Sequence, residues 1–333
     1  MADPTTATPT TTMRAIVQDA YGDAEVLRSA QVARPAIGAH QVLVRVHAAG
    51  LDRGTEHLLT GKPYAVRLAL GLRRPRNPIP GRDVAGTVAA VGAAVTRFAV
   101  GDEVYGIAPG SYAEYAVARE DKLAHKPTNL TYAQSAVVPI SAGTALRALT
   151  EVGKVQAGQS VLVLGASGGV GTYAVQLAKA FGARVTGVCG PTKLDLVTAL
   201  GADRVLDYTV DDFAAGTERY DLILDIGGTP SLTRLRRALQ PGGTVVFVGG
   251  ENAGGLTGMG RQLRGALLSP FLRQRLALLM AKESAETLER LTTLIESGQV
   301  TPSLDRTYPL DEAPTAMRRL AAGRVRGKVA ILV

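Results

Sequence analysis

One stretch of the chain, VLVLGASGGVG at residues 161–171, restricts the possible folds more than any other. Its leading apolar residues are typical of a buried strand, and the glycines open a segment with helical apolar spacing that ends at Gly182. Glycines let the backbone turn tightly out of a strand and approach a pyrophosphate, while N–H groups at the helix start face the phosphates. This context predicts a dinucleotide-binding loop; a purely structural glycine-rich turn is the alternative.

The second half of the chain repeats this alternation of strand and helix. Short apolar runs followed by helical segments are the pattern of βαβ units on a parallel sheet. The predicted strands are 161–164, 184–188, 204–206, 221–225 and 244–248, with a sixth inside 271–280. The pattern therefore predicts an α/β fold with a doubly wound parallel sheet over residues 140–283.

The first half has a different pattern. Residues 13–139 contain short strand-like runs at 14–18, 41–48, 84–91 and 103–105, separated by Gly/Pro turns, which predicts a mostly β domain. After helices near 288–297 and 311–322, a last strand at 328–333 is expected to return to it, so this domain comprises 13–139 and 284–333. Residues 1–12, with six threonines and two prolines, are expected to form a disordered tail.

Composition limits the setting and the partners. A length of 333 residues favours two domains, and the lone cysteine, Cys189, excludes an intramolecular disulfide, so we expect a cytoplasmic protein. The net charge of +8 comes from dispersed arginines, and the densest cluster, at 73–76, has no interleaved aromatic residue. We therefore expect no nucleic-acid partner. No apolar run is long enough to cross a bilayer, so we expect no membrane partner either.

The end of the second predicted strand bears on the choice of dinucleotide. NAD-binding folds usually place Asp or Glu there to bind the ribose 2′ hydroxyl, but no acidic residue occurs between Glu151 and Asp195. Lys193 lies just beyond the strand, where its ammonium would attract a 2′-phosphate. NADP is therefore favoured, with a solvated surface lysine as the alternative.

Several spaced motifs resemble one family over nearly the whole chain after the tail. These are PGRDVAG at 80–86, GDEV at 101–104, GSYAEY at 110–115, TAL at 144–146, the glycine loop at 165–171 and GKV at 327–329. Together they resemble the medium-chain dehydrogenase/reductase superfamily, in particular its zinc-free, quinone oxidoreductase-like branch. The resemblance implies a GroES-like mostly β domain, a Rossmann domain, an active-site cleft between them, and a homodimer formed through the Rossmann sheets.

The resemblance also implies a set of cofactor-binding residues. Thr144 would lie near the nicotinamide, and Lys328 of the last motif joins the set. Residues at the pyrophosphate would be Ala166, Ser167, Gly168, Gly169, Val170 and Gly171; at the adenosine 2′-phosphate Gly190, Lys193 and Tyr208; and at the nicotinamide ribose Val248, Gly249 and Gly250.

The chain departs from the zinc-dependent branch of this family at the ligand positions. Asp52 stands where those alcohol dehydrogenases have a catalytic cysteine, and Gly81-Arg82-Asp83 replaces their Gly-His-Glu. Arginine has no lone pair for zinc, and one cysteine cannot build a four-cysteine zinc lobe, so we expect no metal site. Asp52-Arg53 also replaces the Asn-Pro that is usual in the zinc-free branch.

The residues after that position supply the remaining catalytic candidates. Asp52 either orients substrate or forms an ion pair with Arg53 or Arg82, and His57 either lines the cleft or is a structural histidine. Tyr64, or water in the cleft, is the candidate proton source. The expected activity is NADPH-dependent reduction of a small-molecule electrophile, a quinone or an α,β-unsaturated carbonyl. A zinc-free NADP-dependent alcohol dehydrogenase or carbonyl reductase and a non-catalytic NADPH sensor are the alternatives.

Overall fold

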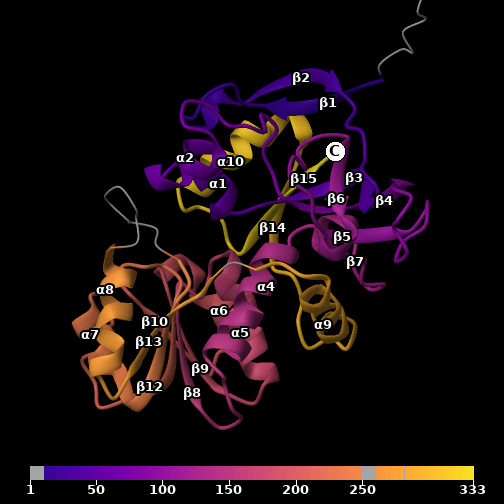
Figure 1. Cartoon of the computed structure of the whole chain (residues 1–333). Helices are drawn as coiled ribbons and strands as arrows, with labels where there is room; N and C mark the ends of the chain where they lie inside the picture. Colours follow the sequence, from indigo (N-terminus) through magenta and orange to yellow (C-terminus); the bar gives the residue numbers. More distant parts are fainter. Residues whose placement is uncertain (1–10, 250–259, 281) are drawn as a thin grey trace, which may run out of the picture.

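The structure is a computed structural model of the chain and describes residues 11–249, 260–280 and 282–333. Its described part forms two lobes, with α4 (Pro139–Arg147) and α9 (Ala285–Glu296) where they meet (Figure 1). The first lobe is mostly β and the second has a six-stranded sheet between helices. The predicted fold class, a GroES-like domain with a Rossmann domain, is therefore confirmed.

The first lobe is built on a sheet with the strand order β14-β15-β3-β4-β5-β7, with β6 paired to β3; β1 and β2 form a separate antiparallel pair. The strand β15 pairs antiparallel with β3, so the end of the chain lies against Ala49 and Gly50. The strands are β1 (Thr12–Val17), β2 (Arg28–Ala33), β3 (Gln41–Leu51), β4 (Asp83–Val91), β5 (Glu103–Ile107), β6 (Tyr115–Arg119), β7 (Leu123–His125), β14 (Leu304–Pro309) and β15 (Lys328–Leu332).

Short helices cover this lobe. They are α1 (Arg53–Thr60), α2 (Arg67–Leu70), α3 (Tyr132–Ser135) and α10 (Ala313–Ala321). The alternating valines of β3, among them Val42 and Val44, are fully buried with Val84 and Val104 in the interior, as a half-buried strand pattern requires. The strands β2, β6, β7 and β14 were not among the predicted strands.

The second lobe has the strand order β10-β9-β8-β11-β12-β13, with every neighbouring pair parallel. The sixth predicted strand is β13, inside 271–280. The strands are β8 (Ser160–Leu164), β9 (Arg184–Cys189), β10 (Arg204–Asp207), β11 (Tyr220–Asp225), β12 (Leu239–Phe247) and β13 (Arg275–Leu278), and the helices are α5 (Gly169–Ala180), α6 (Leu194–Ala199), α7 (Leu232–Ala238) and α8 (Gly260–Leu268). In Figure 1, α7 and α8 lie on one side of this sheet and α5 on the other.

One apolar core runs through the junction of the lobes. It combines Tyr105 of β5 with residues of α4, α5 and β8, and it includes Leu288, Leu291 and Ile295, which share one face of α9. The buried Tyr105 hydroxyl donates a hydrogen bond to the Leu288 carbonyl oxygen at 2.7 Å. This shared core fixes the orientation of the lobes and hence the geometry of the cleft. In the described part of the chain, no helix is long and apolar enough to span a membrane.

Candidate active site

The glycine loop has the geometry of an anion site. Gly165 follows β8 with φ +85°, and Gly168 precedes α5 without a side-chain cap. A Cβ on Gly171 would lie 2.1 Å from the Gly165 carbonyl oxygen, so the helix start packs directly on the strand end. The first N–H groups of α5 therefore lie uncapped at the carboxyl edge of the sheet, where a pyrophosphate is expected to bind.

The neighbouring strand ends lie at the same edge. Gly190 follows β9, and a Cβ built on it would be 3.2 Å from the hydroxyl of Tyr208, which follows β10 and is exposed. Val248 and Gly249 follow β12, and both N–H groups bond to the carbonyl oxygen of Asp225. The structure thus brings the adenosine and ribose candidates to one edge, while Gly250 lies outside the described residues.

Lys193 is engaged by the C-terminal loop. Its ammonium donates hydrogen bonds to the carbonyl oxygens of Gly323 at 3.0 Å and Val325 at 2.7 Å. Arg326 of the same loop donates to the Thr192 carbonyl oxygen at 2.7 Å and pairs with Asp195 at 2.6 Å. The region proposed to bind the 2′-phosphate therefore contains two cationic side chains, those of Lys193 and Arg326. Arg326 is a candidate that the sequence did not indicate, because it is 133 positions from Lys193.

Lys328 joins the two lobes beneath the glycine loop. The side chain is 1% exposed, and its ammonium lies 3.0 Å from the Ser141 hydroxyl oxygen and 3.8 Å from Asp83 Oδ2. A Cβ built on Gly169 would lie 3.0 Å from Lys328 Cδ, so the lysine stem contacts the first turn of α5. Ser141 and Asp83, partners that no local motif predicted, hold the ammonium inside the protein, and a role of Lys328 at the pyrophosphate remains a prediction.

Asp83 is a fully buried carboxyl group. Its Oδ1 accepts a hydrogen bond from the Ile140 N–H at 3.0 Å, whereas Oδ2 has no hydrogen-bond partner among the described residues. Burial raises the pKa of Asp83 to about 7, the Lys328 ammonium opposes this rise, and the nearby Asp52 carboxylate adds to it. The group therefore titrates near neutral pH.

The three residues proposed for catalysis lie on one segment. Asp52 is the N-cap of α1, where its Oδ1 accepts the Thr55 N–H at 2.8 Å, a role that neither alternative for this residue included. Asp is a preferred N-cap residue, so the sequence did carry this signal. His57 is half-buried on α1, and Tyr64 is half-exposed, with the Arg67 guanidinium 4.9 Å from its ring centre. Their catalytic roles remain predictions.

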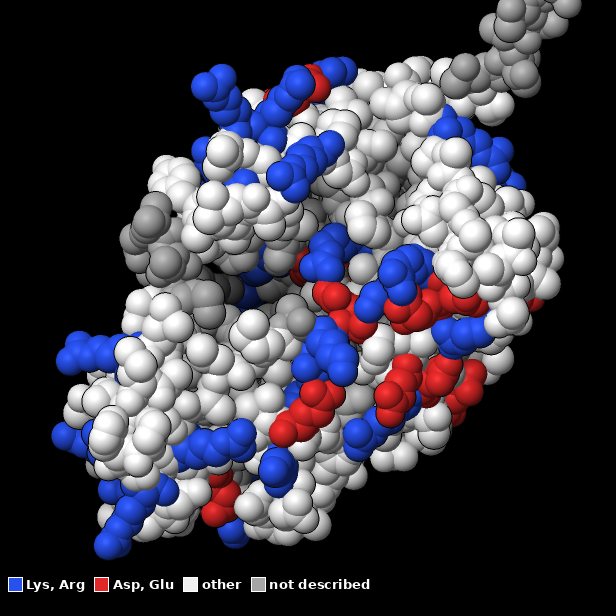
Figure 2. All heavy atoms as spheres, in the orientation of Figure 1, with Lys and Arg blue, Asp and Glu red and all other residues white. Residues whose placement is uncertain are grey.

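A cavity of about 90 Å³ lies where the lobes meet. It is lined by side chains of both, including Arg82, Ile140, Thr144, Arg147, Lys282 and Glu283. Leu279, just beyond β13, also lines it, which places the cavity at the carboxyl edge of the parallel sheet. Figure 2 shows that this face of the molecule is hollowed between the lobes and that lysine and arginine side chains reach the hollow. Thr144 lines this cavity, whereas Asp52, His57, Tyr64 and the glycine loop do not, and its role at the nicotinamide remains a prediction.

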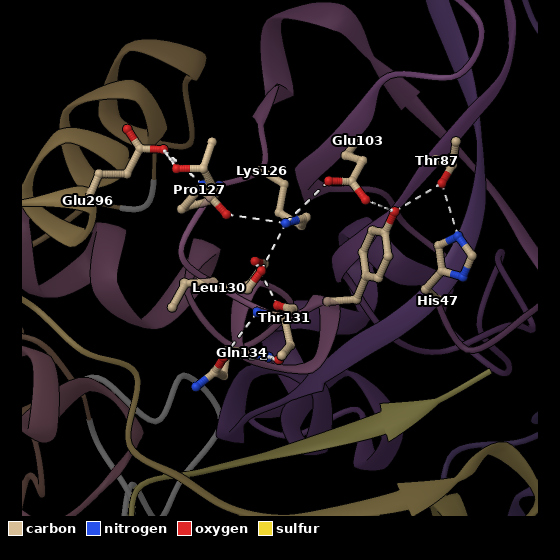
Figure 3. Close-up of polar contacts among 12 residues, drawn as sticks. His47, Thr87, Glu103, Lys126, Pro127, Leu130, Thr131, Gln134 and Glu296 are labelled. Atoms are coloured by element: carbon tan, nitrogen blue, oxygen red, sulfur yellow. Dashed lines mark hydrogen bonds and ion pairs between the residues drawn. The ribbon is translucent and has the colours of Figure 1, made fainter.

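A second polar cluster is structural. His47 Nε2 is 3.0 Å from the Thr87 hydroxyl, which is 3.2 Å from the Tyr132 hydroxyl, which donates to Glu103 at 2.5 Å (Figure 3). Lys126 pairs with the other Glu103 oxygen at 3.3 Å. Partial burial and Arg45 lower the pKa of His47. Each of these groups has a partner within the network, which ties α3 to β3, β4 and β5.

Comparisons with known proteins agree with this architecture. The family model described as the alcohol dehydrogenase GroES-like domain matches residues 38–128, and the model described as zinc-binding dehydrogenase matches residues 200–331. The mitochondrial NAD(P)H oxidoreductase RTN4IP1 of Mus musculus is 34% identical over 99% of this chain and 91% of its own length. The chain belongs to the medium-chain dehydrogenase/reductase family. Its relatives in that family are quinone oxidoreductase-like, and it is an oxidoreductase.

Further members of the family show the same relation. The 2-methylene-furan-3-one reductase of Solanum lycopersicum is 34% identical over 93% of this chain and 76% of its own length. The solved quinone oxidoreductase from Coxiella burnetii superimposes with a TM-score of 0.85 at 29% identity, covering 97% of this chain and 100% of that one.

One of the two matching family models is described as zinc-binding, but the described residues contain no matching set of zinc ligands. No group of three or more His, Cys, Asp or Glu side chains there could hold a metal ion. At the positions that carry zinc ligands in the zinc-dependent branch, Asp52 caps a helix and Arg82 pairs with Glu283. The absence of zinc from the protein itself remains a prediction.

Proposed function

We propose that this oxidoreductase transfers hydride from NADPH to a quinone or an α,β-unsaturated carbonyl. The observation that carries the proposal is the cavity between the lobes, because it joins Thr144 and the carboxyl edge of the dinucleotide sheet to Arg82 of the other lobe. Relatives named quinone oxidoreductase homolog and alkenal/one oxidoreductase support the substrate class. A carbonyl reductase acting on saturated ketones and an NADPH sensor are the rival functions.

The residues present fit a nicotinamide dinucleotide. The uncapped start of α5 and the close contact of Gly171 with Gly165 leave backbone N–H groups for the pyrophosphate. Lys193 and Arg326 supply positive charge near Gly190 for a 2′-phosphate, and Thr144 lines the cavity in which the reacting ring would lie. When bound, the cofactor supplies the hydride. The protein's part is to hold the two reactants in contact and in the right orientation.

The substrate class can be tested with a panel of acceptors. We expect NADPH oxidation with a quinone and an enone to be much faster than with a saturated ketone, because conjugation spreads the product charge. The measurement compares kcat/KM for these acceptors, and for oxidation of a simple alcohol with NADP⁺, under one set of conditions. Faster turnover of the saturated ketone or the alcohol would favour the carbonyl reductase, and NADPH binding without turnover of any acceptor would favour the sensor.

The preference for NADPH over NADH is a further part of the proposal. Replacing Lys193 with methionine removes a charged donor, which should weaken NADPH binding by about 10- to 100-fold and leave NADH binding nearly unchanged. Fluorescence titration of both dinucleotides measures this. Lys179→Met is the matched control. Lys179 pairs with Asp203 at 2.8 Å at the C-terminal end of α5, which is the end away from the glycine loop. Equal affinities of the wild type for the two dinucleotides would contradict the proposal.

We also propose that the chain forms a homodimer through β13. Among the described residues this strand is the last one of the six-stranded sheet, and Leu267 and Phe271 beside it are 74% and 86% exposed. An open strand edge next to exposed apolar side chains favours pairing with a second copy. Sedimentation analysis of the wild type and of Phe271→Asp would test this. A cytoplasmic location likewise stays a proposal.

A further inference from the structure

Arg82 occupies a fixed position at the wall of the cavity between the lobes. It follows Gly81, which has φ +90°, and its carbonyl oxygen accepts a hydrogen bond from the Ala108 N–H at 2.8 Å. A side chain at Gly81 would collide with Tyr112, 2.5 Å away, so the turn that presents Arg82 has little freedom. The guanidinium therefore reaches the cavity from a rigid backbone.

Within the described part of the chain, the Arg82 guanidinium makes one side-chain contact, with Glu283, and its other N–H groups remain available as donors. Its Nη2 lies 2.5 Å from Glu283 Oε1, on the segment that connects β13 to α9. Nε and Nη1 of Arg82 have no hydrogen-bond partner among the described residues, and the side chain is 31% exposed. Because a guanidinium presents several N–H donors in one plane, Glu283 can fix its orientation while the other edge stays available to a ligand.

The other cations of the cavity are placed differently. Arg147 is committed, since Nε and Nη2 bind Glu151 and Nη1 donates to the carbonyl oxygens of Met280 and Lys282. The Lys282 ammonium acts on Glu151, whose pKa it helps to lower, and Lys282 also lines a second hollow on that side of α4. Of the two arginines that line the cavity, Arg82 is therefore the one that still has N–H groups without a hydrogen-bond partner among the described residues.

We propose that Arg82 is the hydrogen-bond donor to the substrate's carbonyl oxygen, with Glu283 as its positioning residue. This inference rests on the proposed reductase function and deepens it. Hydride addition to the carbon β to the carbonyl forms the new C–H bond and moves an electron pair onto the carbonyl oxygen. Arg82 stabilises that oxyanion without giving up its proton, and a solvent proton then completes the saturated product. The overall balance is NADPH, enone and one proton to NADP⁺ and saturated ketone.

Kinetics of Arg82 variants give the first test. Arg82→Ala should lower kcat for an enone by about 100- to 1000-fold, the range for loss of one oxyanion donor, with NADPH affinity nearly unchanged. Arg82→Lys should retain part of the rate, and guanidinium ion added to Arg82→Ala should restore part of it. Arg97→Ala is the matched control, because Arg97 forms a similar 2.5 Å pair with Glu289 across the lobes but does not line the cavity.

An equilibrium probe gives a second test that needs no turnover. 4-Nitrophenol bound in the cavity should ionise at lower pH than in water, because the Arg82 guanidinium stabilises the phenolate, and its absorbance reports this directly. The shift should disappear in Arg82→Ala, shrink in Glu283→Gln if the orientation of the guanidinium is relaxed, and persist in Lys282→Met and Arg97→Ala.

Three outcomes would overturn the proposal for Arg82. These are full enone turnover in Arg82→Ala, a phenol shift that disappears in Lys282→Met instead, and a parallel loss of thermal stability and NADPH affinity in Arg82→Ala without guanidinium rescue. The last result would show that the pair with Glu283 is only a structural tie. If the wild type reduces neither enone nor quinone, the proposed function itself fails, whereas an active wild type with an unaffected Arg82→Ala refutes the Arg82 proposal alone.

Discussion

Replacing Lys328 with methionine is expected to destabilise the protein by about 3 to 5 kcal/mol at pH 9 and above, and far less below pH 6. The Lys328 ammonium, 1% exposed, lies 3.8 Å from the fully buried Asp83 Oδ2. Breaking a buried pair leaves the remaining charge without compensation, which is the physical origin of the large effect. The measurement is denaturant unfolding of both proteins at a series of pH values.

The pH dependence follows from the titration of Asp83. Its pKa in the folded wild type is about 7, above the ordinary value near 4. A raised pKa means that the group's contribution to stability is fully present below the ordinary value and is lost as pH rises through about 7. Without Lys328 the pKa rises further, so the folded variant keeps a proton that its unfolded chain has released. The stability difference should therefore grow by about 1.4 kcal/mol for each pH unit above 7.

A double variant separates charge from packing. Asp83→Asn in the Lys328→Met background removes the carboxylate, so the pH dependence of the difference should disappear and most of the stability at pH 9 should return. Several groups face Asp83 besides Lys328, namely Asp52, Arg82, the Ile140 N–H and the buried Tyr112 and Tyr173, and all of them remain in this variant. An equal loss at pH 6 and pH 9 in Lys328→Met would show that lost packing, not charge, causes the effect.

The sequence predicted those parts of the fold that depend on local pattern. The apolar run before Gly165, the helical spacing after it and the later strand runs each record the environment of their own segment, and β8, α5 and β9 to β13 lie where these patterns indicated. The edge strands β2 and β6 were not predicted, because half-exposed strands carry weaker apolar alternation.

The site was less predictable because its contacts are distant in sequence. Arg82 meets Glu283, 201 positions away, and Lys328 meets Ser141, 187 positions away, only once both lobes are packed. No local pattern marks either pair. Lys193 was predicted to attract a phosphate, but the bonds of its ammonium to the carbonyl oxygens of the C-terminal loop depend on where β15 returns the chain.

Replacing Gly171 with alanine is expected to destabilise the protein by about 2 to 3 kcal/mol or more, and to prevent normal NADPH binding. The new Cβ would lie 2.1 Å from the Gly165 carbonyl oxygen and 2.7 Å from Ala166 Cα. Both contacts are with backbone, so no side chain can rotate away, and the start of α5 must move off the end of β8. That movement would displace the N–H groups that face the pyrophosphate.

Gly168→Ala is the matched control for this loop, because it adds the same methyl group at a position with room. A Cβ there would lie 3.4 Å from the Gly165 carbonyl oxygen, an ordinary contact, and Gly168 has φ −84°, which alanine adopts without strain. We therefore expect the free energy of unfolding of Gly168→Ala to lie within about 1 kcal/mol of the wild-type value. NADPH binding should be weaker, because the new methyl group lies beside the uncapped start of the helix. Thermal and denaturant unfolding give the stability of each variant, and fluorescence titration gives its NADPH affinity. If Gly171→Ala kept wild-type stability, the close contact of α5 with β8 would not be what requires glycine at this position.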